Sequence, residues 1–124
     1  MAIHKSGEDY LEAILMVQNA KGSCRSIDVA HHLNVSKPSV SVAMGLLRDD
    51  GMITTDDDGY LHFTEEGLAR ASDVYARHCL LTDFFVSIGV PADVAEDDAC
   101  KIEHDLSIET YTRLKEFVRT REQA

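Results

Sequence analysis

Hydrophobic positions recur every three or four residues along most of the chain, which is the period of an amphipathic α-helix. In the first half this pattern predicts three helices, within residues 8–22, 26–33 and 36–51. Ser26 and Ser36 are the predicted N-caps of the second and third helices, because a serine hydroxyl accepts the first unpaired backbone N–H groups. A proline in the first turn of the third helix and a glycine after each of the first and third fit the same boundaries. The short break between the second and third helices is typical of a helix-turn-helix.

The pattern changes over residues 52–64, where apolar positions flank the turn sequence Asp56–Gly59. A turn of this composition between short apolar stretches predicts a β-hairpin. Helical spacing then resumes and predicts three more helices, within residues 64–89, 91–106 and 107–120. Thr64 and Ser107 are the expected N-caps of the first and last of these, and Pro91 begins the middle one.

This order of elements predicts a mainly α protein with one small β-hairpin. A hairpin directly after two short helices and a tight turn is typical of a winged helix-turn-helix, a DNA-binding fold. We therefore expect a winged helix-turn-helix domain over residues 1–64 and a three-helix region over residues 65–124. A mixed domain without a DNA role remains the alternative at this point.

The charge of the chain argues against indiscriminate coating of nucleic acid, which depends on neutralising phosphates. The 124 residues include 12 Lys and Arg against 22 Asp and Glu, a net charge of −10. Residues 25–48 reverse this balance, because they carry Arg25, Lys37 and Arg48 against Asp28 alone. This basic stretch coincides with the predicted helix-turn-helix.

No apolar segment is long enough to cross a bilayer, and the N-terminal residues lack the apolar stretch of a signal peptide. The three cysteines, Cys24, Cys79 and Cys100, are odd in number and irregular in spacing, which is a poor disulfide framework. We therefore expect a cytoplasmic protein with reduced thiols.

If the motif is present, the helix that begins near Lys37 enters the major groove, and its exposed N-terminal face extends as far as Val42. Serine hydroxyls and a lysine can contact phosphates or base edges, and a valine can contact a thymine methyl. Each serine can equally be a cap or an exposed surface residue. The acidic turn at residues 56–58 would repel phosphate. The candidate DNA-binding residues are Arg25, Ser36, Lys37, Pro38, Ser39, Ser41 and Arg48.

A second group of candidate functional residues lies in the C-terminal part of the chain. Cys100, Glu103 and His104 stand at positions i, i+3 and i+4, so one helix face would carry a thiol, a carboxylate and an imidazole. Three ligands from one helix do not complete a coordination sphere. Carboxylates, imidazoles and one thiolate together suit a first-row divalent ion such as Fe(II) or Mn(II), with Zn(II), Co(II) and Ni(II) as competitors.

Further ligands must come from elsewhere in the chain. The predicted first helix offers Asp9 and Glu12 at i, i+3, and the long helix offers His78. Each has a simpler interpretation: the two acids are favoured in a first helical turn, and the histidine can be a core residue. Cys100 can be a small buried apolar residue. The combination, rather than any one residue, indicates a metal site.

The motifs "GEDYLEAI", "VSKPSVSVAMGLL", "YARHCLL" and "ACKIEHDLS", in this order, resemble the diphtheria-toxin-repressor family of metal-dependent transcriptional regulators. The resemblance spans nearly the whole chain, and in length the chain is closest to the manganese-transport-regulator branch, which lacks the C-terminal SH3-like domain. It implies a homodimer that binds a near-palindromic DNA operator and represses metal-homeostasis genes when Fe(II) or Mn(II) is bound. It also implies that Zn(II) or Co(II) binds in vitro, with no membrane or organic substrate involved. By this resemblance the metal ligands are Asp9, Glu12, His78, Cys100, Glu103 and His104.

One ligand position departs from the manganese branch, which has glutamate where this chain has Cys100. The iron-responsive branch has cysteine there, but it has methionine in the first helix where this chain has an aspartate. The set is therefore a hybrid. A thiolate is a softer ligand than a carboxylate and favours Fe(II) over Mn(II).

Other functions remain open from sequence. A winged-helix regulator could sense oxidation or a small ligand through Cys100 without a metal effector. A winged helix could also serve protein contacts alone. A metalloenzyme is disfavoured, because the chain has no HExxH motif and no Gly-rich loop, and we expect no catalytic residues.

Overall fold

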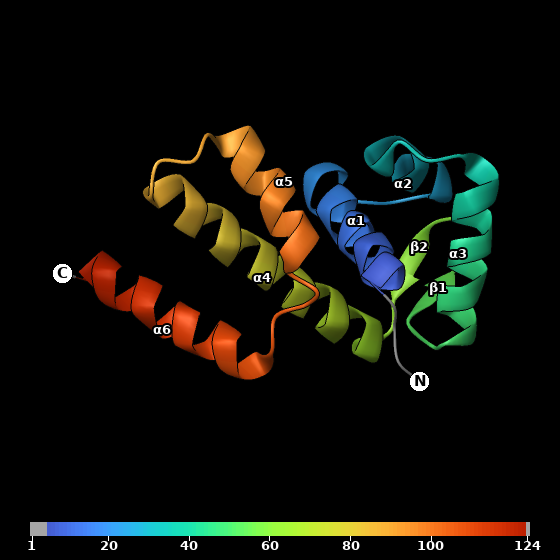
Figure 1. Ribbon diagram of the computed structural model, residues 1–124. Helices are drawn as coiled ribbons and strands as arrows, with labels where there is room; N and C mark the ends of the chain where they lie inside the picture. Colours follow the sequence, from blue (N-terminus) through green and yellow to red (C-terminus); the bar gives the residue numbers. More distant parts are fainter. Residues whose placement is uncertain (1–4, 124) are drawn as a thin grey trace. The chain divides into compact units, whose positions relative to one another are not determined.

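The computed structural model describes residues 5–123, and backbone contacts divide the chain into two compact units, residues 1–73 and 74–124. The helices and strands follow the predicted order, which confirms a mainly α fold with one small hairpin (Figure 1). None of the described helices is long and apolar enough to cross a membrane. The elements are α1 (Lys5–Lys21), α2 (Ser26–Leu33), α3 (Lys37–Asp49), β1 (Ile53–Thr55), β2 (Leu61–Phe63), α4 (Glu65–Ser87), α5 (Ala92–Ile102) and α6 (Ile108–Gln123).

The first unit is built on α1, α2 and α3, which pack against one another around a shared core. Each helix contributes the apolar face that its sequence period predicted, including Leu11 and Ile14 from α1, Val29 from α2, and Val40 and Met44 from α3. All five side chains are at most 1% exposed, so this core is close to fully excluded from water. Burial of such apolar area is the main stabilising term for a domain of this size.

Three of the four predicted caps are confirmed. Ser36, Thr64 and Ser107 each accept a hydrogen bond from the backbone N–H three residues later, at 3.3, 3.0 and 3.1 Å. These caps set the first residues of α3, α4 and α6.

The predicted cap of α2 is wrong. Arg25 is the N-cap, and Ser26 is the first helical residue. The Asp28 carboxylate accepts the Arg25 backbone N–H at 2.9 Å and also pairs with Lys21 at 2.8 Å. An acid in the first turn therefore stabilises the start of α2 by accepting the backbone N–H of the N-cap residue.

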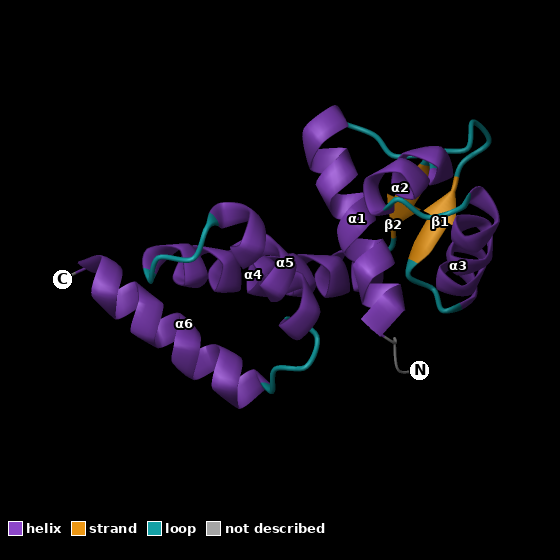
Figure 2. Ribbon diagram, turned by 45° about the horizontal axis from the view of Figure 1, so that its top comes forward, coloured by secondary structure: helices purple, strands orange, loops and turns teal. Residues whose placement is uncertain are grey.

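The two strands form a short hairpin (Figure 2). They are antiparallel, with Ile53 opposite Phe63 and Thr55 opposite Leu61. The hairpin is joined to the start of the unit through Leu61, whose N–H donates to the Cys24 carbonyl at 2.8 Å and whose carbonyl accepts from Gln18 Nε2 at 3.1 Å. Cys24 itself is fully buried, and burial raises the pKa of its thiol to about 11. It is a core residue rather than a reactive one.

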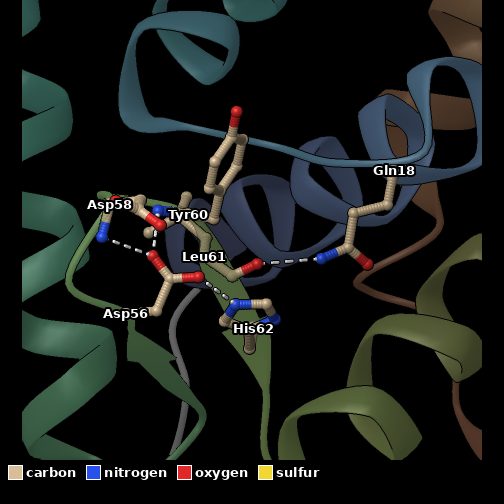
Figure 3. Close-up of polar contacts among 6 residues, drawn as sticks. All are labelled: Gln18, Asp56, Asp58, Tyr60, Leu61 and His62. Carbon is tan, nitrogen blue, oxygen red and sulfur yellow. Dashed lines mark hydrogen bonds and ion pairs between the residues drawn. The ribbon is translucent and has the colours of Figure 1, made fainter.

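Asp56 organises the turn of the hairpin (Figure 3). One carboxylate oxygen accepts the backbone N–H groups of Asp58 and Tyr60, each at 2.9 Å, and the other lies 2.8 Å from His62 Nε2. The bond to His62, followed by the bonds from Tyr60 and Asp58, lowers the pKa of Asp56 below its usual value. The acidic turn therefore has a structural role, because Asp56 holds it together by hydrogen bonds, in addition to its expected repulsion of phosphate.

In the second unit, α6 runs in the same direction as the part of α4 that belongs to this unit. Arg77 lies over the Tyr111 ring at 4.8 Å, and further along both helices the Phe84 and Phe117 rings meet edge to face at 6.4 Å. Gly89 ends α4 in a left-handed conformation, with φ of 102°, as a C-terminal glycine commonly does.

Candidate metal and DNA-binding sites

Glu103 lies at the C-terminal end of α5 and is completely buried. Its N–H still bonds to the Ala99 carbonyl at 3.0 Å, but the helix ends at Ile102, whereas the sequence pattern predicted helix as far as residue 106. Arg77 holds the segment that follows, because its guanidinium donates to the carbonyls of Leu106 at 2.7 Å and Glu103 at 3.4 Å. The chain therefore turns at His104 instead of continuing as a helix.

Three other candidate ligands lie around the Glu103 carboxylate. His78 Nδ1 lies 2.9 Å from one carboxylate oxygen, and His104 Nε2 lies 3.4 Å from the other. The Cys100 thiol lies within 4.8 Å of a carboxylate oxygen of the same residue. The three candidates predicted together near the end of α5 and the one predicted on α4, 25 positions before Glu103, thus form one cluster within the second unit.

The electrostatics of this cluster favour a cation. The side chains of Glu103 and His104 are 0% and 2% exposed, so the carboxylate has lost its water. Burying a carboxylate is costly unless positive charge or hydrogen bonds compensate. In the described part of the chain, one oxygen of Glu103 has no hydrogen bond, only the longer ion-pair contact to His104. Oxygen, nitrogen and sulfur donors around such a carboxylate fit a first-row divalent ion.

The other two candidate ligands lie on α1 in the first unit. Asp9 and Glu12 are one helical turn apart and offer carboxylate oxygens within 4.8 Å of each other. Glu12 is only 5% exposed, which is unusual for an acid and argues against a simple solvated first-turn residue. These two residues can supply hard oxygen ligands to a divalent ion.

The candidate DNA-binding residues all lie on the surface of the first unit. All seven are exposed, including Ser36, Lys37, Pro38, Ser39 and Ser41 at the start of α3. The Ser36 hydroxyl serves as the cap of α3, as one of the two interpretations predicted.

The two arginines of the basic stretch each contact the hairpin. The Arg25 guanidinium stacks on the Tyr60 ring at 4.3 Å, and Arg48 donates to the Thr55 hydroxyl at 2.9 Å. These contacts hold long side chains near the surface where a phosphate would approach.

Two residues that position candidate site residues are not predicted by the sequence pattern. Arg77 shapes the turn that carries Glu103 and His104, and Tyr60 supports Arg25. Neither belongs to a ligand pattern, and no local signal identifies them. Their roles follow from tertiary contacts between segments that are distant in the sequence.

Both halves of the chain match domains of one known protein family. Residues 3–62 match the N-terminal DNA-binding domain of iron-dependent repressors, and residues 64–124 match the metal-binding and dimerisation domain of the same repressors. The chain is 31% identical over 110 residues to the transcriptional regulator MntR of Escherichia coli. The aligned region covers 89% of this chain and 71% of the regulator.

Two solved structures have the same fold. The manganese regulator SloR has 27% identity and a TM-score of 0.81 over 96% of this chain and 55% of its own. A manganese-dependent transcriptional repressor in complex with manganese has 26% identity and a TM-score of 0.79 over 87% of this chain and 50% of its own. The chain thus spans about half the length of these two proteins. The named relatives are transcriptional regulators and not enzymes.

Proposed function

Because the chain belongs to the iron-dependent repressor family, we propose that it is a transcriptional repressor whose DNA binding requires Fe(II) or Mn(II). The observation that carries the proposal is the buried Glu103 carboxylate, clustered with two imidazoles and near a thiol in the unit that matches the metal-binding domain. An acidic protein of net charge −10 needs such a switch, because its charge opposes contact with phosphate.

The proposed ligands come from both units. The second unit contributes its four clustered donors, and the first contributes the carboxylates of α1. A divalent ion bound to both sets would neutralise carboxylates and hold the two units in one arrangement. Two copies of the chain would then present their α3 helices at a fixed separation, as two half-sites of a near-palindromic operator require. The proposed set is Asp9, Glu12, His78, Cys100, Glu103 and His104.

For the physiological ion we favour Fe(II). Cys100 is half-buried beside the Glu103 carboxylate, and a thiolate ligand there would be softer than a carboxylate. Zn(II) and Co(II), which bind mixed nitrogen, oxygen and sulfur sites well, are expected to bind in vitro.

The proposed assembly is a homodimer formed through the second unit, whose described surface exposes several large apolar side chains. Ile88 at the end of α4 is 57% exposed, and Ile108 and Phe117 on α6 are 68% and 50% exposed. Apolar surface of this kind favours a protein interface. The regulated genes would be those of metal homeostasis, and the protein would act in the cytoplasm, where it meets DNA.

The test is an anaerobic titration of Fe(II) or Mn(II) into the metal-free protein, read by fluorescence anisotropy of labelled DNA from upstream of its own gene. We expect one ion to restore DNA binding at micromolar free metal. Glu103→Ala and His104→Ala should fold and lose this response, because each removes a proposed ligand. Asp98→Ala, which removes an exposed acid of the preceding helix α5, is the matched control and should respond like the wild type. A full metal response in both ligand variants would refute the assignment.

A further inference from the structure

The outer face of α3 carries apolar side chains that contribute little to the core. Val42 is 66% exposed and Leu46, one helical turn later, is 60% exposed, whereas Val40, Met44 and Leu47 fill the buried face. A β-branched residue lowers helix propensity, so an exposed valine in mid-helix slightly destabilises α3. Val42 therefore adds little to the stability of the fold, and its side chain is available for contact with another molecule.

A neighbouring glycine supports a close approach to this face. Gly45 lies inside α3, where glycine costs stability relative to alanine. A Cβ atom built on Gly45 would meet nothing within 4 Å, so packing inside the described chain does not require a glycine there. A missing side chain at such a position lets the helix backbone come close to a partner.

The polar groups on α3 indicate which end of the helix is suited to contact DNA. The Ser36 hydroxyl donates to the Ser39 hydroxyl at 2.8 Å, which leaves the Ser39 hydrogen for an acceptor outside this pair. Lys37 adds positive charge at this end, and the positive end of the helix dipole favours phosphate. At the other end of the helix, the exposed Asp49 offsets the charge of its neighbour Arg48, so this end carries no net positive charge. The exposed face of α3 from Lys37 to Gly45 is thus the part suited to a groove.

We infer that Val42 reads DNA sequence by packing its methyl groups against the C5-methyl of a thymine in the major groove. This inference rests on the proposed function and specifies it, because it assigns one position of each half-site to a T·A pair. The thymine methyl is the apolar feature of the major groove edge, and a valine at the surface of a groove-binding helix is its natural partner. Ser39, one turn earlier, would donate to a phosphate or a base acceptor beside it.

The experiment removes only that methyl. Each thymine of the duplex bound in the metal titration is replaced in turn by uracil. Affinities are measured for the wild type, Val42→Ala and Leu46→Ala at a saturating concentration of the ion that restored binding in that titration. For the wild type we expect one thymine in each half-site whose replacement weakens binding about fourfold, as expected for one methyl returned to water. Val42→Ala should bind more weakly and lose the sensitivity at that thymine. Leu46→Ala, which removes an exposed aliphatic side chain one turn further on, should keep it.

The outcomes separate the two proposals. Absence of a sensitive thymine, or sensitivity that survives in Val42→Ala, overturns the inference while metal-dependent binding stands. Sensitivity lost in Leu46→Ala but kept in Val42→Ala also overturns it, since another residue would then read the base. No metal-dependent DNA binding at all would refute the proposed function itself. Val42→Ala should fold, because alanine is the better helix former at an exposed position.

Discussion

Gly67, in the first turn of α4, lies directly against the backbone of Met52, which joins α3 to β1. A Cβ atom added to Gly67 would overlap the Met52 carbonyl oxygen and lie 2.7 Å from its carbonyl carbon. The same place is tied by Thr64, whose hydroxyl donates to the Gly51 carbonyl at 2.6 Å and accepts from the Gly67 N–H at 3.0 Å. These bonds hold the two backbones together, so neither can move away from an added methyl without loss.

The effect of Gly67→Ala is the balance of two terms. Alanine favours the helix over glycine by roughly 1 kcal/mol. Overpacking against backbone atoms costs about 3 kcal/mol, at the upper end of the usual range, because no flexible side chain can yield. The net destabilisation is therefore about 2 kcal/mol, or a fall in Tm of roughly 8 °C for a chain of this length.

The assay is urea denaturation of the metal-free protein, followed by circular dichroism, with Gly45→Ala as the matched control. The control makes the same substitution in a helix interior where the new Cβ meets nothing within 4 Å. It should therefore gain about 0.5–1 kcal/mol. The reasoning is refuted if Gly67→Ala is as stable as the wild type, or if the two variants change stability in the same direction.

Two further predictions concern the metal site and the hairpin. Replacing Cys100 by glutamate should shift the preference between Fe(II) and Mn(II) toward Mn(II) by about tenfold, measured as the ratio of metal concentrations that half-restore DNA binding; an unchanged ratio would mean that the thiol does not ligate. The pKa of Asp56 is lowered by His62 and by the N–H groups of Tyr60 and Asp58. The charged carboxylate therefore stabilises the hairpin fully above about pH 4, and this stabilisation is lost as the pH falls through the lowered pKa. The amide signals of Asp58 and Tyr60, followed by NMR, should titrate with a midpoint below pH 4, and a midpoint at or above that value would contradict the assignment.

Local patterns in the sequence predicted most of the fold. Helical spacing, the caps at Ser36, Thr64 and Ser107, and the turn at residues 56–59 each depend on neighbours a few positions away, so they can be identified without a structure. The cap of α2 was misassigned because an acid at Asp28 competes with the serine, and local propensity does not decide between them.

The candidate metal cluster was only partly predictable. Spacing drew attention to Cys100, Glu103 and His104, but it placed them on one helix face. The helix ends before His104, and the turn that follows is held by Arg77, a residue from a distant segment that donates to the carbonyls of Glu103 and Leu106. The burial of Glu103 and its contact with His78 likewise depend on tertiary packing, which no local pattern contains.

The attachment of the hairpin has a consequence for protein engineering. Strands of three residues do not form a stable hairpin alone, and this one is completed by the bonds of Leu61 to Cys24 and Gln18. Arg25 adds a bridge and a stacking contact to Tyr60. The hairpin is therefore not a cassette that can be exchanged with another winged helix at its two ends. A graft that keeps its shape has to carry the end of α1 and the segment before α2 along with it.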